Sequence, residues 1–165
     1  MTAAERMHQI REQMLADGNS VSFVELGGGV ALVGYQSKFR WRWFATKLHL
    51  FTVVLAVPEA TSEQLSVHTQ QAVDYAMATK GKLRGLQVGI AVIPALASEA
   101  VPADARQAVE ARPPKKWSAF VFPAIVDLTT NETHWYRGRI LWGRLYDRWL
   151  RTRLERVLVV NDPGR

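Results

Sequence analysis

The sequence predicts one domain of α/β or α+β class, with a mixed, mainly antiparallel sheet of five to seven strands flanked by helices. Segments with a helical period are interspersed with apolar segments rich in β-branched and aromatic residues. Hydrophobic residues make up 48% of the 165 residues and charged residues 22%, as in globular proteins. No repeat, low-complexity tract or long linker divides the chain, so residues 1–165 are predicted to form a single domain.

Four segments have helical periodicity. Thr2 and Glu5 have the spacing of a capping box at the start of the first. Pro102 suits the first turn of the third helix, and the prolines at 113–114 end it. The predicted helices cover residues 2–17, 61–81, 102–111 and 138–158.

Six segments favour strands. The three glycines at 27–29 separate the first two segments and predict a hairpin. The third segment changes the phase of its alternation, which predicts a bulge or bend near residues 43–45. Pro123 cannot donate a ladder hydrogen bond, so we expect an edge or a bulge in the fifth segment. The predicted strands cover residues 21–23, 30–33, 39–57, 86–93, 117–128 and 133–136.

Composition and missing motifs exclude several classes of function. The chain has no cysteine, which excludes disulfides, thiolate zinc sites and cysteine nucleophiles. The four histidines fall in four predicted elements, and no Gly-x-Ser-x-Gly motif is present, so we predict no cofactor and no metal site. No apolar run reaches the roughly 18 residues of a membrane span, and no secretory signal is recognisable. We therefore expect a cytoplasmic protein without a membrane span.

The net charge of +6 favours an anionic partner. Residues 117–165 hold eight arginines and five acids, which gives +3 of that charge, and residues 27–57 hold no acid. The predicted anion-binding residues are Arg40, Arg42, Lys47, Arg144, Arg148 and Arg151. The predicted aromatic interface residues are Trp41, Trp43, Trp142 and Trp149.

Both basic segments also have a purely structural interpretation. Alternation along residues 38–44 would place the arginines on a solvated face and the rings on a buried face. The arginines of residues 138–158 would form a solvated helix face, and its tryptophans a core or a subunit interface. An acidic membrane surface is a third alternative for this helix.

The element order over residues 2–93 is helix, three strands, helix and strand. This order resembles the core of the restriction-endonuclease-like (PD-(D/E)XK) nucleases. The resemblance implies a divalent metal held by carboxylates on the middle strands, with a lysine two residues after one of them. At the comparable position this chain has Ala45, Thr46 and Lys47, with alanine in place of the acid. The resemblance therefore implies an inactive domain of that fold that retains affinity for anions.

Two functional hypotheses follow. The first is a non-enzymatic domain that binds nucleic acid or another phosphate-containing ligand, or that assembles with itself. The second is a hydrolase whose carboxylates meet only in the folded chain. Its candidates are Glu25, Asp74, Glu99 and Asp127. A short distance between Glu25 and Asp127 in a cleft would favour the hydrolase.

Overall fold

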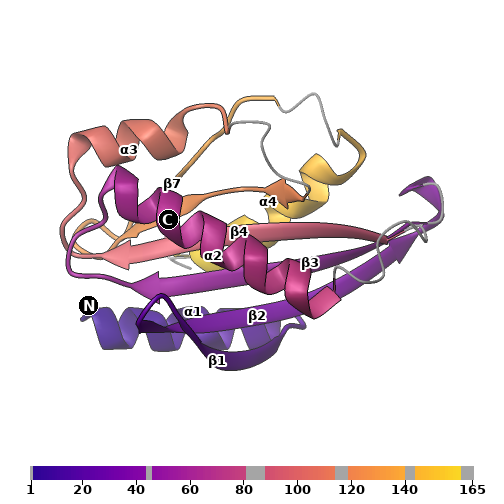
Figure 1. The fold of residues 1–165 in the computed structure, drawn as a ribbon, viewed down its shortest axis with the longest axis horizontal. Coiled ribbons are helices and arrows are strands. Elements are labelled where there is room, and N and C mark those ends of the chain that lie inside the picture. The colour runs from indigo at the N-terminus through magenta and orange to yellow at the C-terminus, as the bar shows by residue number, and fades with distance from the viewer. Residues whose placement is uncertain (1, 44–45, 81–87, 114–118, 140–143, 161–165) are drawn as a thin grey trace.

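The computed structural model describes residues 2–43, 46–80, 88–113, 119–139 and 144–160 (Figure 1). Within these ranges it has four α-helices, one 3-10 turn and seven strands. The helices are α1 (Ala3–Ala16), α2 (Ser62–Lys80), α3 (Ala103–Glu110) and α4 (Arg144–Leu158), and the turn η1 is Trp41–Trp43. The strands are β1 (Ser20–Leu26), β2 (Gly29–Arg40), β3 (Thr46–Ala56), β4 (Val88–Ser98), β5 (Phe120–Val121), β6 (Ala124–Asp127) and β7 (Thr133–Trp135).

The seven strands form one mixed sheet. Its order is β1-β2-β3-β4-β6-β7, and β5 also pairs with β4. The pairs β1–β2, β2–β3 and β6–β7 are antiparallel, whereas β4 is parallel to β3, β5 and β6. The predicted fold class and element order are confirmed. The order of elements alone does not confirm the nuclease-like core.

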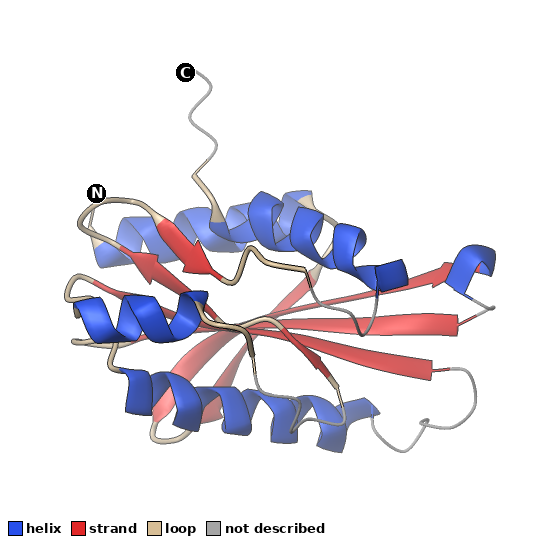
Figure 2. Ribbon diagram, turned by 90° about the horizontal axis from the view of Figure 1, so that it is seen from above, coloured by secondary structure: helices blue, strands red, loops and turns tan. Residues whose placement is uncertain are grey.

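Helices cover both faces of the sheet, which gives three layers (Figure 2). On one face, Ile10 of α1 and Leu154 of α4 pack against Leu50 of the sheet in one buried cluster. On the other face, α2 buries Ala72 against Val53. None of the described helices combines the length and hydropathy of a membrane-spanning segment.

Two prolines explain an interruption beside the central strand. Phe122 N donates to Val92 O at 2.9 Å. In a regular parallel ladder, Phe122 O would accept from the amide two residues beyond Val92, which is Pro94 and has no N–H. β5 therefore ends at Val121, and the interruption expected at Pro123 separates it from β6. β4 itself continues to Ser98, beyond the strand predicted to end at residue 93.

The bend predicted near residues 43–45 begins slightly earlier. β2 ends at Arg40, and the chain turns through η1 before β3 begins at Thr46. Helix α4 begins at Arg144 rather than at residue 138, and residues 140–143 lie outside the described part of the chain.

A buried arginine fixes α4 against α1. Arg6 is fully buried, and its guanidinium donates to Leu158 O and to the side-chain oxygens of Gln9 and Gln13. The last carbonyls of a helix lack intrahelical partners and carry partial negative charge, which the arginine complements. Burial lowers the pKa of Arg6. This contact holds α4 in place beside the site described next.

Candidate anion-binding site

Two predicted anion-binding residues lie at one end of the sheet, where β2 ends and β3 begins. The side chains of Arg40 and Lys47 are both exposed. In the antiparallel register, Arg40 is opposite Thr46, whereas Lys47 is opposite Phe39. Because neighbours along a strand alternate between faces, Arg40 and Lys47 point to opposite faces of the sheet. This end of the sheet is therefore basic on both faces.

The predicted arginines of α4 differ in their surroundings. Arg151 Nε lies 3.0 Å from both carboxylate oxygens of Asp147, and its guanidinium also donates to the carbonyls of Tyr136 and Gly138. These contacts tie α4 to the segment that follows β7, so we leave Arg151 out of the candidate site. Arg148 is exposed on the outer side of the helix. The remaining predicted side chains, those of Arg42, Arg144 and Trp142, lie outside the described part of the structure.

The aromatic residues at the end of β2 do not follow the predicted alternation. The last four residues of β2 are exposed, because this strand extends past the helices that cover the sheet (Figure 1). Phe39 is therefore 47% exposed. The chain leaves the strand after Arg40, and the 3-10 turn leaves Trp41 81% exposed but Trp43 only 2%. The expected solvated basic face is present at Lys38 and Arg40. The expected buried aromatic face is wrong for Phe39 and Trp41, because β2 extends past its covering helices and strand periodicity stops at Arg40.

A polar groove opens beside β2, between the end of α1 and α4. Its volume is about 510 Å³. Lys38 and Arg40 are two residues apart on the strand, so both point to the face that borders the groove. Among the described residues, no carboxylate lies within 4 Å of either cation. The lining includes Asp17, Gly18, Ser20, Gln36, Ser37, Lys38, Arg40, Trp149 and Arg153.

Asp17 joins the three elements around the groove. Its carboxylate, with only 3% of the side chain exposed, accepts from Arg153 at 2.8 Å and from Gln36 at 3.1 Å, and Arg156 lies 3.6 Å away. Asp17 therefore neutralises one cation of the groove. The lining cations Lys38, Arg40 and Arg153 against this one carboxylate leave a net charge of +2.

Two buried indoles support the cations. The rings of Trp43 and Trp149 lie 5.5 Å apart between their centroids. The Arg40 guanidinium lies 5.2 Å from the centroid of Trp43, and that of Arg153 lies 5.8 Å from the centroid of Trp149. Both distances allow cation–π attraction. The predicted interface residues Trp43 and Trp149 thus lie in the core and orient two arginines.

The opposite face of the same end is also positively charged. His49 Nδ1 lies 2.7 Å from the hydroxyl of Tyr35, and Lys80 lies 5.2 Å from the Tyr35 ring centroid. Burial lowers the pKa of His49, and the positive charges of Lys47 and Lys80 lower it further. The two lysines thus add a positive potential to the effect of burial on the pKa of His49.

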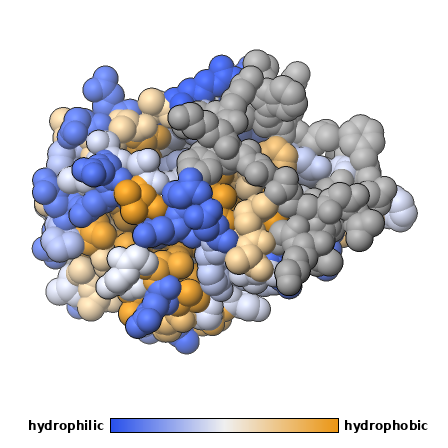
Figure 3. Space-filling view, in the orientation of Figure 1, coloured by the Kyte–Doolittle hydropathy of each residue, from blue (hydrophilic) through white to orange (hydrophobic). Residues whose placement is uncertain are grey.

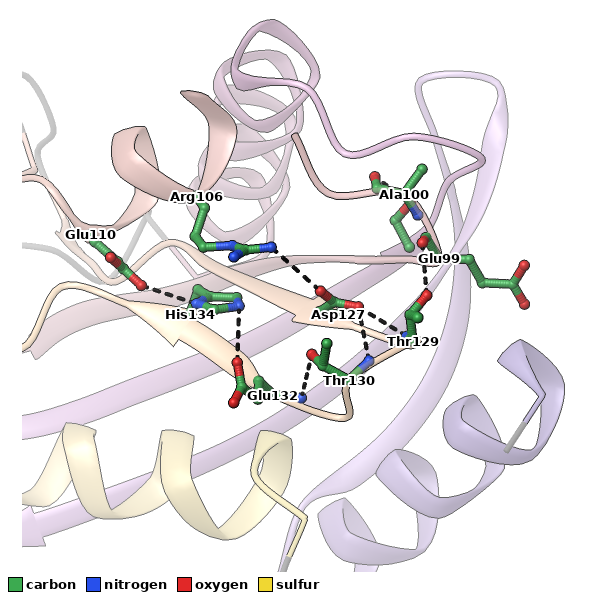
Figure 4. A network of polar contacts seen from close by, with 10 residues as sticks. Glu99, Ala100, Arg106, Glu110, Asp127, Thr129, Thr130, Glu132 and His134 are labelled. Carbon is green, nitrogen blue, oxygen red and sulfur yellow. Dashed lines mark hydrogen bonds and ion pairs between the residues drawn. The ribbon is translucent and has the colours of Figure 1, made fainter. Parts of the chain in front are cut away.

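The other end of the sheet contains a polar network in which Asp127 and His134 pair with charged residues of α3 (Figure 4). The buried Asp127 ends β6, and its Oδ1 accepts from the backbone N–H groups of Thr129 and Thr130 at 2.9 and 3.1 Å. Its Oδ2 lies 3.7 Å from Arg106 of α3. Asp127 therefore fixes the turn after β6 and attracts α3 to it.

A histidine on the neighbouring strand adds to this network. His134 Nδ1 lies 2.9 Å from a carboxylate oxygen of Glu110 on α3, and its Nε2 lies 3.9 Å from Glu132 (Figure 4). The described residues include no group of three or more acids or histidines that could hold a metal ion. The geometry is that of a link between α3 and the β6–β7 hairpin.

The predicted carboxylate pair does not form. Glu25 lies on β1 and Asp127 on β6, which are four positions apart in the strand order. At about 4.8 Å per strand, their backbones are separated by roughly 19 Å. Glu99 follows β4 and is close to Asp127 in the chain fold, but its carboxylate points away from the network (Figure 4). Glu25 and Glu99 thus form no carboxylate cluster with Asp127.

Three groove residues were absent from the predicted site. Lys38 lies two residues before Arg40, and this spacing predicts that both side chains point to the same face of the strand. Arg153 follows Trp149 by one helical turn, which places both on one side of α4. Asp17 gives no sequence signal for its role, because its partners come from two distant elements.

Comparisons with protein-family models, with curated proteins and with solved structures found no match to this chain.

Proposed function

We propose that this protein binds single-stranded nucleic acid at the end of the sheet where β2 finishes. The binding surface, called the β2 end below, consists of Lys38, Phe39, Arg40, Trp41 and Lys47. One observation carries the proposal: exposed cations on both faces of the sheet surround an exposed aromatic pair, with no carboxylate of the described residues within 4 Å of those cations.

The cations suit a phosphate backbone. Lys38 and Arg40 are separated by about 6.7 Å along an extended strand, so they can contact different phosphates of one chain. The planar Arg40 guanidinium can bind a phosphate through two donors, whereas a lysine acts as a point charge. The groove behind them, with its net charge of +2, extends the positive surface toward α4. Such a surface raises the local concentration of polyanions.

The aromatic pair favours a ligand with exposed bases. The rings of Phe39 and Trp41 contact each other edge to face, at 5.4 Å between centroids and 80° between planes. This contact orients Trp41 and leaves most of its indole in solvent. Bases of single-stranded nucleic acid stack on such rings, whereas duplex bases are stacked on one another. The combination therefore supports single-stranded over double-stranded nucleic acid.

Strand alternation predicts rings and cations on opposite faces. The two kinds of side chain are separated in this way in the interior of a strand, where the sheet lies between the two faces. At the end of a strand this separation is lost, because a flexible ligand can pass around the strand end and contact rings and cations together. Lys47 lies directly opposite Phe39 in the register, which places a cation beside the aromatic pair.

Binding of a labelled thymidine oligonucleotide and of inorganic polyphosphate tests the proposal. K38E/R40E should weaken binding of both polyanions by at least about tenfold, because two attractive charges become repulsive. The matched control is R112E/R137E, which changes the net charge equally at exposed positions that follow α3 and β7, and β7 is four positions from β2 in the strand order. An equal loss in the control would show that total charge, not this surface, drives binding, and would contradict the proposal.

Trp41→Ala separates stacking from charge. It should weaken oligonucleotide binding by about 5- to 100-fold, the effect expected of one stacked base, and leave polyphosphate binding unchanged. Trp41→Phe should retain most of the affinity. Equal binding of the oligonucleotide by Trp41→Ala and the unmodified protein would exclude base stacking, as would equal loss for both ligands. If Trp41→Ala weakened binding to anionic vesicles but not to the oligonucleotide, the β2 end would instead bind a membrane surface.

A further inference from the structure

Strand β1 forms a free edge of the sheet. Among the described residues it pairs only with β2, so the backbone groups on its outer side have no strand partner. The opposite edge differs, since β7 has only three residues, whereas β1 has seven. A long edge with unpaired N–H and C=O groups is a template for another strand.

The edge lacks the features that normally prevent such pairing. β1 contains no proline, no lysine and no glycine, and its one charged residue is Glu25. Natural proteins protect edge strands with prolines, bulges and charged side chains, above all lysine. The near absence of these features indicates that the edge is covered in the working form of the protein.

Apolar side chains are exposed beside this edge. Phe23, at the centre of β1, is 65% exposed, and Val30 of β2 is 58% exposed. Phe23 is opposite Leu32 and Glu25 is opposite Val30, so Phe23 and Val30 lie on the same face of the sheet. Figure 3, in the orientation of Figure 1, shows the opposite face of the sheet, the one that α2 covers, where hydrophobic residues also lie among polar ones at the lower margin beside β1.

The strand is complementary to itself. An antiparallel pair of β1 strands that matches all seven residues, Ser20–Leu26, is centred on Phe23. This register places Phe23 opposite the same residue of the other copy, Ser22 opposite Val24 and Glu25 opposite Val21. The two Glu25 carboxylates then lie on opposite sides of the centre, which avoids like charges in direct opposition. Two central aromatic rings form a favourable cross-strand pair.

We infer that β1 is a homodimer interface, in which two copies of this chain pair their β1 strands antiparallel and form one continuous sheet of fourteen strands. The pairing satisfies the free backbone groups of both edges and covers Phe23. It is a symmetric, isologous contact, which closes after two copies and does not propagate into a fibre. It uses the edge of the sheet farthest in strand order from β6 and β7. It includes none of the five residues of the β2 end, although Ser20, at the start of β1, also lines the groove.

The mass in solution, measured by light scattering over a range of concentrations, tests the interface. The unmodified protein should be a dimer, and both F23D and F23K should be monomers, because each places like charges opposite each other at the centre. A mixture of F23D and F23K chains should form dimers again, since opposite charges then face each other. Dimers can re-form in the mixture only if residue 23 of one copy faces residue 23 of the other.

A matched control and a second readout keep the test independent of folding. Val67→Asp changes an exposed apolar residue of α2 and should leave the dimer intact. Because the chain has no cysteine, F23C introduces a single thiol, which a short bifunctional maleimide should cross-link between copies far faster than the thiol of V67C. A monomeric unmodified protein would overturn the inference. So would dimers of F23D and F23K as stable as the original, or equal cross-linking at the two positions.

Discussion

The two ends of the central sheet differ in how their charges are satisfied. At the end where β6 finishes, Asp127 accepts from two backbone amides and lies beside Arg106, and His134 contacts Glu110. At the β2 end, Lys38, Arg40 and Lys47 are exposed with no described carboxylate within 4 Å. Paired charges at one end stabilise the fold, whereas unpaired charges at the other are available to a ligand. The difference separates a structural network from the proposed binding surface.

This comparison predicts that the largest effect on stability comes from the paired end. Asp127→Ala should lower the free energy of unfolding by about 1–3 kcal/mol, because two backbone donors lose their acceptor and Arg106 loses its ion-pair partner. Asp127→Asn should lose less, since its side-chain oxygen can still accept from the amides of Thr129 and Thr130. Urea unfolding of the two variants measures both effects. Equal and negligible losses would show that the network is not structural.

A second prediction concerns the middle of the sheet, where α2 packs on it and buries His68. His68 is buried, its Nε2 lies 3.0 Å from Val53 O, and burial lowers its pKa from the ordinary 6.5. The folded protein therefore binds this proton less readily than the unfolded chain. Stability should be fully present above about pH 6.5 and fall as the pH decreases from there toward the lower folded pKa.

His68→Gln should flatten this pH dependence, because the amide can still donate to Val53 O but does not titrate. His49, whose pKa is also lowered, should account for part of the slope that remains. Unfolding free energies between pH 5 and 8 measure the slope, about the range in which imidazoles titrate. An unchanged slope in the His68→Gln variant would contradict the assignment.

The smallest effect on stability is expected at the β2 end. Lys38→Ala, Arg40→Ala, Lys47→Ala and Trp41→Ala should each change the free energy of unfolding by no more than about 0.5 kcal/mol, because these side chains are exposed. The same urea titrations provide the measurement. A loss of about 2 kcal/mol or more, as for a core residue, would show that these residues stabilise the fold. The contrast between the two ends of the sheet would then not hold.

Much of the fold could be predicted because its signals are local. Thr2 and Glu5 make both hydrogen bonds of the capping box, and the glycines at 27–29 form the predicted hairpin between β1 and β2. The proline at 123 marks a real interruption of the sheet. The capping box and the hairpin depend on neighbouring residues alone, so sequence periodicity and turn chemistry were sufficient to predict them.

The candidate site was predictable only in part, because it depends on tertiary contacts. Arg40 was recognisable as a cation, but its position above Trp43 depends on where the strand ends. The ion pair of Asp17 with Arg153 joins residues 136 positions apart, and no local pattern specifies it. Alternation predicted a buried Phe39, because it carries no information on how far a strand extends beyond the covering helices.

The salt dependence of oligonucleotide binding tests the central claim most directly. For the unmodified protein, the logarithm of the affinity should fall linearly with the logarithm of the salt concentration. In the K38A/R40A/K47A variant, the slope should be smaller by about 2, since each lost phosphate contact removes about 0.7 for a single strand. The same slope in both proteins, or an affinity that does not depend on salt, would contradict a phosphate-binding role for the β2 end.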